Sequence, residues 1–439
     1  MSDRLCVEGG VKLTGVVKAQ GAKNAALPVM AAALLLQEGA LSIDRVPRLE
    51  DVTIMADLLR HLGASVEHVG GRMTVKVGGD LGRYETPDVL VRKMRASSLV
   101  LGPLLARRGR AILPLPGGCS IGSRPIDLHL KGLARMGANL EIRRGAVYAT
   151  APGRLRGSRI YLDFPSVGAT ENLLMAAACA KGETVLENAA REPEITNLAH
   201  ALVAMGASIE GAGSGTIHIQ GVDGLKGGAI TVIPDRVEAS TFLIAGALTG
   251  GEVTVTDVVP EHMEALLSKL EEAGASLMVR ESSVTVRADG PLSGVTLKTL
   301  PYPGFPTDLQ PQMMVLLCLA EGTGIIHETV FESRFLHVGE LKRMGAKIEL
   351  QGNTSIVTGT PILNGAEVRG TDLRACAALV LAGLTARGTT VISDVHHLWR
   401  GYEAFVEKIR QIGGLISVLD DDGKASFPVE TPEAFANHQ

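Results

Sequence analysis

Cysteine and aromatic residues are scarce in this chain of 439 residues. Aromatic side chains make up only 3% of it, so Leu, Val, Ile, Ala and Met have to fill the core. The five cysteines are Cys6, Cys119, Cys179, Cys318 and Cys376. Their odd number and irregular spacing argue against a disulfide framework and against a metal held by cysteines. We therefore expect a reduced, cytoplasmic setting for the protein.

Signals for membranes, cofactors and nucleic acids are also missing. No run reaches the roughly 18–20 apolar residues that cross a bilayer, and the first ten residues lack the apolar segment of a secretory leader. The net charge of −4 gives no general attraction to nucleic acid or to an anionic membrane. The sequence contains neither a GxxxxGKS/T loop nor an HExxH motif. We expect small-molecule partners, no nucleic acid, no membrane insertion, no metal and no cofactor.

What the chain does contain is one unit, about 70 residues long, repeated six times. The pattern "LGASVE" at 62–67 recurs as "MGANLE", "MGASIE", "AGASLM", "MGAKIE" and "IGGLIS". Its glycines are Gly63, Gly137, Gly206, Gly274, Gly345 and Gly413. A second glycine, followed by alternating apolar residues, precedes each of them: Gly39, Gly109, Gly182, Gly250, Gly322 and Gly388. Two independent markers that stay in phase six times indicate a true internal repeat.

Each unit predicts the order helix, strand, helix, strand, strand. The first helix, as in "EASTFLIAGALTGG", is apolar nearly all round and is expected to be buried. The second helix is amphipathic, and the last two strands form a hairpin, as in "SVEHVGGRMTVKV". This period is longer than that of solenoids, so we expect three units to pack into each globule, with helices inside and sheets outside. The predicted fold class is α/β, with two similar domains, a cleft between them and a candidate crossover at 221–236.

Charged residues gather where the chain leads into a helix. Lys23 and Asn24 stand at the start of a buried helix, where backbone N–H groups and an ammonium together favour an anion. A lysine that merely reaches for the surface is the alternative interpretation. Other charged residues in comparable places are Arg95, Arg124, Asp127, Arg334, Asp372, Arg374 and Arg400. If these edges meet, their arginines suit a small polyanion that carries phosphate and carboxylate groups.

Two further residues suggest chemistry. Asp308 lies between a Pro-rich turn and a helix, where it serves as a functional carboxylate, as a helix N-cap, or as both. Cys119 lies in "PGGCSIGSRP", a glycine-rich loop in which Arg124 is placed to lower the pKa of the thiol. The other cysteines lie in apolar segments or on an early strand. A reactive thiol on a pliable loop indicates a lid that delivers an acid or a nucleophile to a bound substrate.

The motifs "GAKNAALP", "MRAS", "PGGCSIGSRPIDLH", "SVGATEN", "NAAREPEI", "FPTDLQ", "VFESRF" and "TDLRA" resemble those of the UDP-N-acetylglucosamine 1-carboxyvinyltransferases, an enolpyruvyl transferase family. The resemblance runs in order from about residue 8 to residue 417. It implies two inside-out α/β barrels of three units each. One domain would combine residues 1–22 with 230–439, and the other, 23–229, would carry the cysteine loop. It also implies transfer of the enolpyruvyl group of phosphoenolpyruvate to the 3'-hydroxyl of UDP-N-acetylglucosamine, the first committed step of peptidoglycan synthesis.

The same resemblance implies roles for individual residues. Cys119 would be the general acid and Asp308 the base. Phosphoenolpyruvate would be held by Lys23, Asn24, Arg124 and Arg400. The UDP-sugar would be surrounded by Arg95, Arg124, Pro125, Ile126, Asp127, Leu128, Ser166, Val167, Gly168, Asp308 and Val330. Supporting roles would fall to Arg334, Asp372 and Arg374.

The sequence departs from the family pattern at one place and leaves two other functions open. Phe164 and Pro165 stand where many members have a lysine, which affects the expected contact with the diphosphate. A transferase acting on shikimate 3-phosphate shares the fold and the donor, but the loop cysteine and "RPIDLH" argue against it. A catalytically silent, UDP-sugar-binding relative would have lost the acid, the base or the cationic cluster, and this chain keeps all three.

Overall fold

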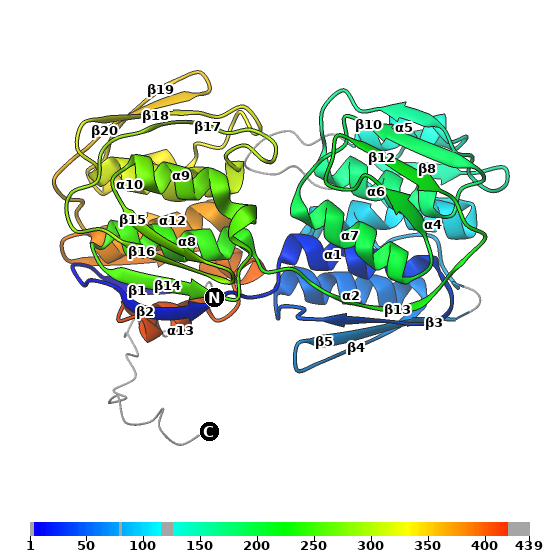
Figure 1. Ribbon diagram of the computed structural model, residues 1–439, viewed down its shortest axis with the longest axis horizontal. Coiled ribbons are helices and arrows are strands. Elements are labelled where there is room, and N and C mark those ends of the chain that lie inside the picture. Colours follow the sequence, from blue (N-terminus) through cyan, green and yellow to red (C-terminus); the bar gives the residue numbers. More distant parts are fainter. Residues whose placement is uncertain (1–3, 79–80, 116–125, 420–439) are drawn as a thin grey trace. The chain divides into compact units, whose positions relative to one another are not determined.

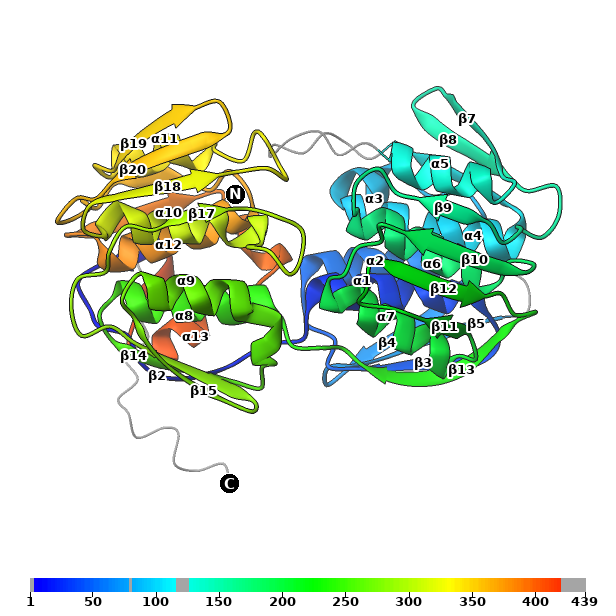
Figure 2. The same ribbon diagram turned by 45° about the horizontal axis from the view of Figure 1, so that its top comes forward.

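A computed structural model of the chain describes residues 4–78, 81–115 and 126–419. It has the mixed α/β fold class predicted from the sequence. By their contacts the residues separate into two compact units. Unit 1 is made of Met1–Lys18, Ala239–Lys298 and Thr307–Gln439, and unit 2 of Ala19–Glu238 and Thr299–Pro306. Figures 1 and 2 show that within each unit the strands lie around the helices.

The predicted order of elements is confirmed along the chain. The apolar helices are α1 (Lys23–Ala32), α4 (Leu101–Arg108), α6 (Val167–Ala178), α8 (Arg236–Leu248), α10 (Gln310–Leu319) and α12 (Leu373–Thr385). The strands that follow them are β3 (Leu36–Asp44), β6 (Arg110–Pro114), β10 (Glu183–Glu187), β14 (Glu252–Thr256), β18 (Thr323–His327) and β22 (Thr389–Ser393). The amphipathic helices are α2 (Glu50–Leu62), α5 (Asp127–Arg135), α7 (Pro193–Ala204), α9 (Glu264–Glu272), α11 (His337–Arg343) and α13 (Phe405–Gln411).

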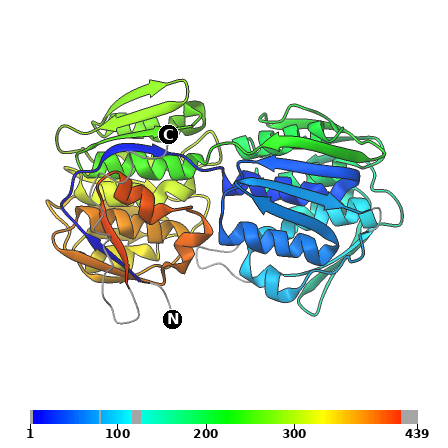
Figure 3. The same ribbon diagram turned by 90° about the horizontal axis from the view of Figure 1, so that it is seen from below.

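A hairpin ends each of the first five repeats. In the sixth repeat the N-terminal strand takes the place of the missing hairpin strand. The hairpins are β4–β5 (Ala64–Val69, Arg72–Val77), β7–β8 (Asn139–Arg143, Ala146–Thr150), β11–β12 (Ser208–Glu210, Thr216–Gln220), β15–β16 (Ser276–Arg280, Ser283–Arg287) and β19–β20 (Lys347–Gln351, Thr354–Thr358). In the sixth repeat, β23 (Leu415–Leu419) pairs instead with the N-terminal strand β1 (Arg4–Glu8). Figure 3 shows this blue strand within the unit that holds the C-terminal half.

The repeat glycines adopt one backbone conformation in each of the two positions. The glycines that follow the amphipathic helices, Gly63, Gly137, Gly206, Gly274, Gly345 and Gly413, have φ between 93° and 108°. The other six repeat glycines, which lie just before the central strands or, for Gly39, within β3, have φ between 64° and 90°. Left-handed backbone is strained for residues with a Cβ, which is why glycine recurs at both positions.

Two linking strands are exchanged between the units. Strands β9 (Arg159–Tyr161), β17 (Thr296–Lys298) and β21 (Glu367–Arg369) each run parallel to the strand that follows the next helix. By contrast β2 (Thr14–Lys18), which leads to α1, pairs with β14, and β13 (Leu225–Thr231), which leads to α8, pairs with β3. This exchange joins the N-terminal segment to the C-terminal half in unit 1, whereas unit 2 is discontinuous because it includes Thr299–Pro306.

One of the crossings between the units lies two residues beyond the candidate crossover at 221–236. The chain passes from one unit to the other after Lys18 and after Glu238, whereas the sequence-based bounds are 22/23 and 229/230. Inside unit 2 the flanking segments pair with each other, because Ala22 N–H donates to Ile233 O (2.8 Å) and Asp235 N–H to Gln20 O (2.9 Å). No helix of the described residues is long and apolar enough to span a bilayer.

Candidate active site

The predicted site residues that the structure describes lie mainly at helix starts of successive repeats. Lys23 begins α1, Ser166 precedes α6, and Asp372 precedes α12. Arg95 begins a short 3-10 helix at Arg95–Val100 that leads into α4, and Asp308 lies in another, Thr307–Leu309, that leads into α10. Cys119, Arg124 and Pro125 lie outside the described residues. The predicted pattern of charged helix starts is thus present in both units.

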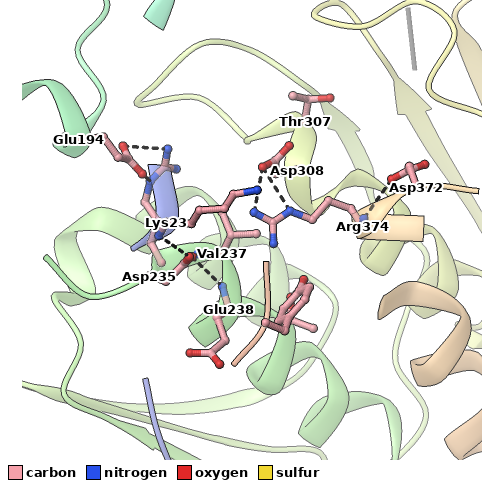
Figure 4. A network of polar contacts seen from close by, with 12 residues as sticks. Lys23, Glu194, Asp235, Val237, Glu238, Thr307, Asp308, Asp372 and Arg374 are labelled. Atoms are coloured by element: carbon pink, nitrogen blue, oxygen red, sulfur yellow. Dashed lines mark hydrogen bonds and ion pairs between the residues drawn. The ribbon is translucent and has the colours of Figure 1, made fainter. Parts of the chain in front are cut away.

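In unit 1 the carboxylate of Asp308 is held by two buried arginines. Arg334 donates from Nη1 to Oδ1 (2.8 Å), and Arg374 donates from Nε and Nη2 to Oδ2 (3.2 and 3.1 Å). Each arginine side chain is 3% exposed, whereas that of Asp308 is 27% exposed. Buried guanidinium groups require a counter-charge, so this arrangement orients Asp308 strongly while leaving part of its carboxylate accessible. Figure 4 shows Arg374 extended toward Asp308.

A buried glutamate supports the segment around Asp308. Glu328 accepts the hydroxyl hydrogen bond of Thr307 (2.9 Å), the residue before Asp308. Its other oxygen accepts the backbone N–H groups of Val330 (2.8 Å) and Phe331 (3.0 Å). Glu328 is fully buried, so it fixes the loop that carries Val330 to the turn that carries Asp308. The sequence analysis did not single it out.

The helix-capping alternative for Asp308 is wrong. Leu309 is the N-cap residue of α10, and no side chain caps that helix. Asp372, by contrast, is a true N-cap, because Oδ1 accepts the N–H groups of Arg374 (2.9 Å) and Ala375 (3.1 Å). Asp372 thereby fixes the first turn of α12, from which the side chain of Arg374 reaches Asp308. Asp308, Arg334, Asp372 and Arg374 therefore lie together within unit 1.

In unit 2 the ammonium group of Lys23 is buried in an ion pair. Its Nζ atom lies 3.0 Å from Oδ2 of Asp51, a residue in the first turn of α2. The side chains of Lys23 and Asp51 are 11% and 5% exposed. Lys23 therefore does not reach for the surface, which was the alternative interpretation of its place in the sequence. An anion that binds to Lys23 has to share the ammonium with Asp51.

A second carboxylate joins the starts of α1 and α8. Asp235 accepts the backbone N–H of Lys23 at Oδ2 (3.4 Å), and at Oδ1 it accepts those of Val237 (2.9 Å) and Glu238 (3.0 Å). Glu238 in turn accepts the backbone N–H of Gln20 (2.7 Å). The contacts of Lys23 with Asp235 and of Asp235 with Glu238 appear in Figure 4. Asp235 and Glu238, which are more than 200 residues away in the chain, therefore hold the segment around Lys23 in place.

Six of the residues expected around the UDP-sugar lie at the adjoining ends of α5 and α6: Ile126, Asp127, Leu128, Ser166, Val167 and Gly168. Ser166 caps α6 by accepting the N–H of Ala169 (3.3 Å). A Cβ on Gly168 would come within 3.2 Å of the His129 ring, so a side chain at this position would require the ring to shift by a few tenths of an ångström. The other expected residues here are Ile126, which is buried, Asp127, which is exposed, and Leu128 and Val167, which are half-buried.

His129 is a neutral histidine held in one orientation. Asn172 donates from its amide to Ser98 O (3.0 Å) and lies 3.0 Å from Nδ1 of His129. Because the Asn172 amide nitrogen is a donor, Nδ1 accepts and the proton resides on Nε2. Burial lowers the pKa of His129 to about 4, with a smaller lowering contribution from the charge of Arg95. The sequence analysis quoted this histidine within "RPIDLH" but assigned it no structural role.

The remaining predicted residues lie in different places. Asn24 is exposed on α1, and Arg95 and Arg400 are half-buried. Arg400 ends a 3-10 helix at Val395–Arg400. Val330 is half-buried in the loop fixed by Glu328. Among the residues that the structure describes, no cluster of His, Cys, Asp and Glu is placed to hold a metal ion.

The described cysteines are unreactive in character. Burial raises the pKa of the Cys179 thiol to about 11 and those of Cys318 and Cys376 to about 12. Burial also raises the pKa of Cys6, with a further contribution from Glu8. The interpretation of Cys179, Cys318 and Cys376 as small apolar residues is consistent with their environment. Cys119, the fifth, remains a prediction.

Solved structures define the class of protein to which this arrangement of repeats belongs. The enolpyruvyl transferase NikO from Streptomyces tendae superimposes with a TM-score of 0.85 at 28% identity, covering 95% of this chain and 99% of that one. EPSP synthase from Acinetobacter baumannii superimposes with a TM-score of 0.74 at 21% identity and shares the fold. The architecture is that of the enolpyruvyl transferases.

Sequence comparisons identify the family. The sequence model of the EPSP synthase (3-phosphoshikimate 1-carboxyvinyltransferase) family matches residues 7–409, and the chain belongs to this family. UDP-N-acetylglucosamine 1-carboxyvinyltransferase 1 of Caldanaerobacter subterraneus subsp. tengcongensis is 51% identical over 416 residues, which cover 95% of this chain and 99% of that protein. UDP-N-acetylglucosamine 1-carboxyvinyltransferase 2 of Carboxydothermus hydrogenoformans is 52% identical over 421 residues, or 95% and 100% of the two chains.

Proposed function

We propose that this protein transfers the enolpyruvyl group of phosphoenolpyruvate to the 3'-hydroxyl of UDP-N-acetylglucosamine and releases phosphate, which commits the sugar to peptidoglycan synthesis. The relatives that carry this activity in their names match the chain along nearly its whole length. The structural observation on which the proposal rests is the carboxylate of Asp308, fixed through both oxygens by Arg334 and Arg374. A rigidly held, partly accessible carboxylate suits a base that receives a proton from a bound hydroxyl.

The reaction is an addition followed by an elimination. Cys119 donates a proton to the methylene carbon of phosphoenolpyruvate, which leaves positive charge on the carbon that bears the phosphate. The 3'-oxygen of the sugar bonds to that carbon while Asp308 accepts the hydroxyl proton. The Cys119 thiolate left by the first step then takes a proton from the new methyl group. The C–H electron pair forms the new carbon–carbon double bond as the carbon–oxygen bond to phosphate breaks, and inorganic phosphate leaves with the electron pair of that bond. Cationic side chains stabilise the departing phosphate.

The donor is held mainly by cationic side chains. Lys23, Asn24, Arg124 and Arg400 bind the phosphate and carboxylate of phosphoenolpyruvate. Lys23 is the member of this set whose surroundings are most informative, because its ammonium is already oriented by Asp51 at 3.0 Å. When the donor binds, its anionic groups compete with Asp51 for that ammonium.

The acceptor is held by the residues expected from the sequence. These are Arg95, Arg124, Pro125, Ile126, Asp127, Leu128, Ser166, Val167, Gly168, Asp308 and Val330. The neutral, donor-bearing Nε2 of His129 lies beside Gly168 and completes this group.

In the finer description of the fold, each unit is an inside-out α/β barrel of three repeats. The arrangement of sheets around buried helices supports this description.

The test is phosphate release from phosphoenolpyruvate with each acceptor supplied separately. We expect release with UDP-N-acetylglucosamine and none with shikimate 3-phosphate. Cys119→Ser is expected to slow release sharply, because a hydroxyl is a far weaker acid than a thiol. Phosphate release only with shikimate 3-phosphate would show that the protein is instead a transferase that acts on shikimate 3-phosphate. No release with either acceptor would favour a catalytically silent sugar-binding protein.

A further inference from the structure

Asn172 is the centre of a buried hydrogen-bond network within unit 2. It lies in α6 and is fully buried. Its Oδ1 atom accepts the backbone N–H of Gly102 (2.7 Å), and its Nδ2 atom donates to the carbonyl oxygen of Ser98 (3.0 Å). The reversed amide would place oxygen against oxygen and N–H against N–H, so only one orientation satisfies both partners. The second hydrogen of Nδ2 is therefore directed to Nδ1 of His129, at 3.0 Å.

His129 is consequently held in one tautomer. Because Nδ1 faces an N–H donor, it has to accept, and the proton of the neutral ring resides on Nε2. Burial lowers the pKa of His129 to about 4, so the ring is neutral near pH 7; the charge of Asp127 raises this pKa and that of Arg95 lowers it. The elements packed against α5 also carry Glu171 on α6, and Glu141 and Arg143 on β7.

The Nε2 atom lies next to the first turn of α6, the helix beside α5 (Figure 1). A Cβ at Gly168 would lie 3.4 Å from Nε2, which forms no hydrogen bond with any residue that the structure describes. In the same turn Ser166 accepts the N–H of Ala169 (3.3 Å), whereas those of Val167 and Gly168 have no partner within the helix. The His129 donor and the helix start together suit an anionic oxygen.

We propose that Asn172 is a positioning residue for the acceptor: it keeps the proton of His129 on Nε2, from which it donates to a phosphate oxygen of the UDP-sugar at the start of α6. This inference rests on the proposed function, which brings the nucleotide sugar to Val167 and Gly168. A diphosphate only accepts hydrogen bonds, so the other tautomer would turn a lone pair toward it. The neutral ring supplies the donor without proton uptake.

Asn172→Asp tests the choice of tautomer. The new carboxylate can only accept, so it draws the ring proton to Nδ1 and leaves a lone pair on Nε2 at pH 8. It also raises the pKa of His129, because a negative charge favours the imidazolium, and below that pKa the Nε2 donor returns. We expect the Kd for UDP-N-acetylglucosamine, measured by calorimetric titration, to be about tenfold above the wild-type value at pH 8 and to approach it at pH 5.5. The wild-type Kd should change less than about threefold over this range.

Asn197→Asp is the matched control. Asn197 is another buried amide of unit 2, and it donates to Thr231 O (3.1 Å) and accepts the N–H of Ile233 (3.4 Å), both of them backbone groups rather than a histidine. This variant should bind the UDP-sugar as the wild type does at both pH values.

Two changes at His129 carry the test if Asn172→Asp does not fold. His129→Gln places an amide N–H near the position of Nε2, whereas His129→Asn reaches only the position of Nδ1. We expect His129→Gln to bind UDP-N-acetylglucosamine within about threefold of the wild type and His129→Asn to bind about 10- to 100-fold more weakly. Equal affinities for the wild type and His129→Asn would overturn the contact with phosphate.

The tautomer is measured without turnover, by nitrogen NMR of protein labelled at histidine. We expect a protonated Nε2 and an unprotonated Nδ1 in the wild type, and the reverse would overturn the role of Asn172. A loss of affinity in Asn172→Asp that does not recover at pH 5.5 would leave Asn172 a purely structural amide. If the wild type binds the UDP-sugar but releases no phosphate, the proposed function fails and the contact stands. If it binds no UDP-sugar, the contact fails too.

Discussion

The two units hold their principal charged groups in opposite ways. In unit 1 a carboxylate, Asp308, is held by two guanidinium groups that are almost fully buried, and the carboxylate is the most exposed member of the group. In unit 2 an ammonium, Lys23, is buried and its partner Asp51 is more buried still. Unit 1 therefore presents its reactive group outward, whereas unit 2 keeps its cation inside an ion pair.

This difference teaches how one repeat serves two chemical roles. Both groups stand at the start of a buried helix, because the repeat places a loop followed by α1 or α10 at equivalent points. What differs is the partner: unit 1 supplies cations from α12 and from the loop before α11, and unit 2 supplies carboxylates from α2 and from the segment before α8. The repeat fixes the position of the charged group along the chain. The neighbouring repeats supply its counter-charge, which leaves Asp308 partly exposed but buries Lys23 in an ion pair.

We expect the largest effect from a change at Asp308, the partly exposed carboxylate of unit 1. Asp308→Asn removes the proposed base but keeps a similar shape between Arg334 and Arg374. We expect kcat to fall about 10²- to 10⁴-fold, the usual contribution of a positioned acid or base. Phosphate release at saturating substrates measures it, with Asp289→Asn at an exposed ion pair as the control. A loss of less than threefold would remove Asp308 from the chemistry and leave it a structural counter-ion.

Thiol reactivity provides a second comparison, between Cys119 and the other cysteines. Burial raises the pKa values of Cys6, Cys179, Cys318 and Cys376. A thiol with a pKa of 11 or 12 is ionised to only about 10⁻³ or 10⁻⁴ at pH 8, so the buried cysteines should react at least about 100-fold more slowly than a free thiol.

Peptide mapping after brief treatment with an epoxide such as fosfomycin measures this difference. We expect label on Cys119 alone, and none in the described cysteine peptides until the protein unfolds. Label on Cys318 or Cys179 in the folded protein would contradict both the burial of those thiols and the special reactivity assigned to Cys119. Cys119→Ser, which should take up no label, is the matched control.

The buried pair in unit 2 allows stability and activity to be separated. Lys23→Met leaves Asp51 without its buried counter-charge, and we expect a loss of about 3–5 kcal/mol in the free energy of unfolding. The double variant Lys23→Met, Asp51→Asn removes both charges and should recover most of that loss while remaining inactive. Denaturant titration and phosphate release measure the two properties. Recovery of activity in the double variant would show that Lys23 serves only the structure.

Much of this could be predicted from the sequence, because repetition makes weak local signals strong. One glycine at a helix end says little, but six in phase predicted the elements and their order. The partners of the site residues could not be predicted in this way. Asp51, Asp235 and Glu328 act across packed elements, and nothing in the local pattern distinguishes them from solvated carboxylates.

Strand exchange was hidden from the sequence for a related reason. The local patterns of β2 and β13 match those of other linking strands, and only the choice of neighbouring strand differs. That choice depends on the folding of whole units, which periodicity does not report. The segment Thr299–Pro306 falls by its position in the sequence in the C-terminal half, whereas its contacts place it in unit 2. The functional roles of Cys119 and Arg124 stay predictions, since both residues lie outside the described ranges.

The smallest effect concerns an acidic cluster found in unit 2. Burial, with contributions from the charges of Glu194 and Glu192, raises the pKa of Glu171 well above its ordinary value of 4.5. Above pH 4.5 the folded protein must keep a proton that the unfolded chain releases, so Glu171 costs stability as pH rises toward its folded pKa. Glu171→Gln should therefore raise the melting temperature by a few degrees at pH 8 and by less at pH 5.

Glu187, an exposed glutamate whose pKa is shifted in the opposite direction, serves as a control. The hydrogen bond from Arg159 lowers the pKa of Glu187, so its contribution is present above pH 4.5 and is lost as pH falls through its folded value. Glu187→Gln should leave the melting temperature unchanged or slightly lowered at pH 8. If Glu171→Gln is more stabilising at pH 5 than at pH 8, the raised pKa assigned to Glu171 is wrong.

The central claim, enolpyruvyl transfer through addition and elimination, is tested most directly by carrying out the reaction in deuterium oxide. Protonation of the methylene carbon by a solvent-exchanged acid would create a methyl group that carries deuterium, and loss of a proton from it would leave deuterium in the vinyl group of the product. We predict deuterium at that carbon of the enolpyruvyl-bearing UDP-sugar, detected by mass spectrometry. A product formed from UDP-N-acetylglucosamine without deuterium would contradict the addition step and the role of Cys119 as its acid.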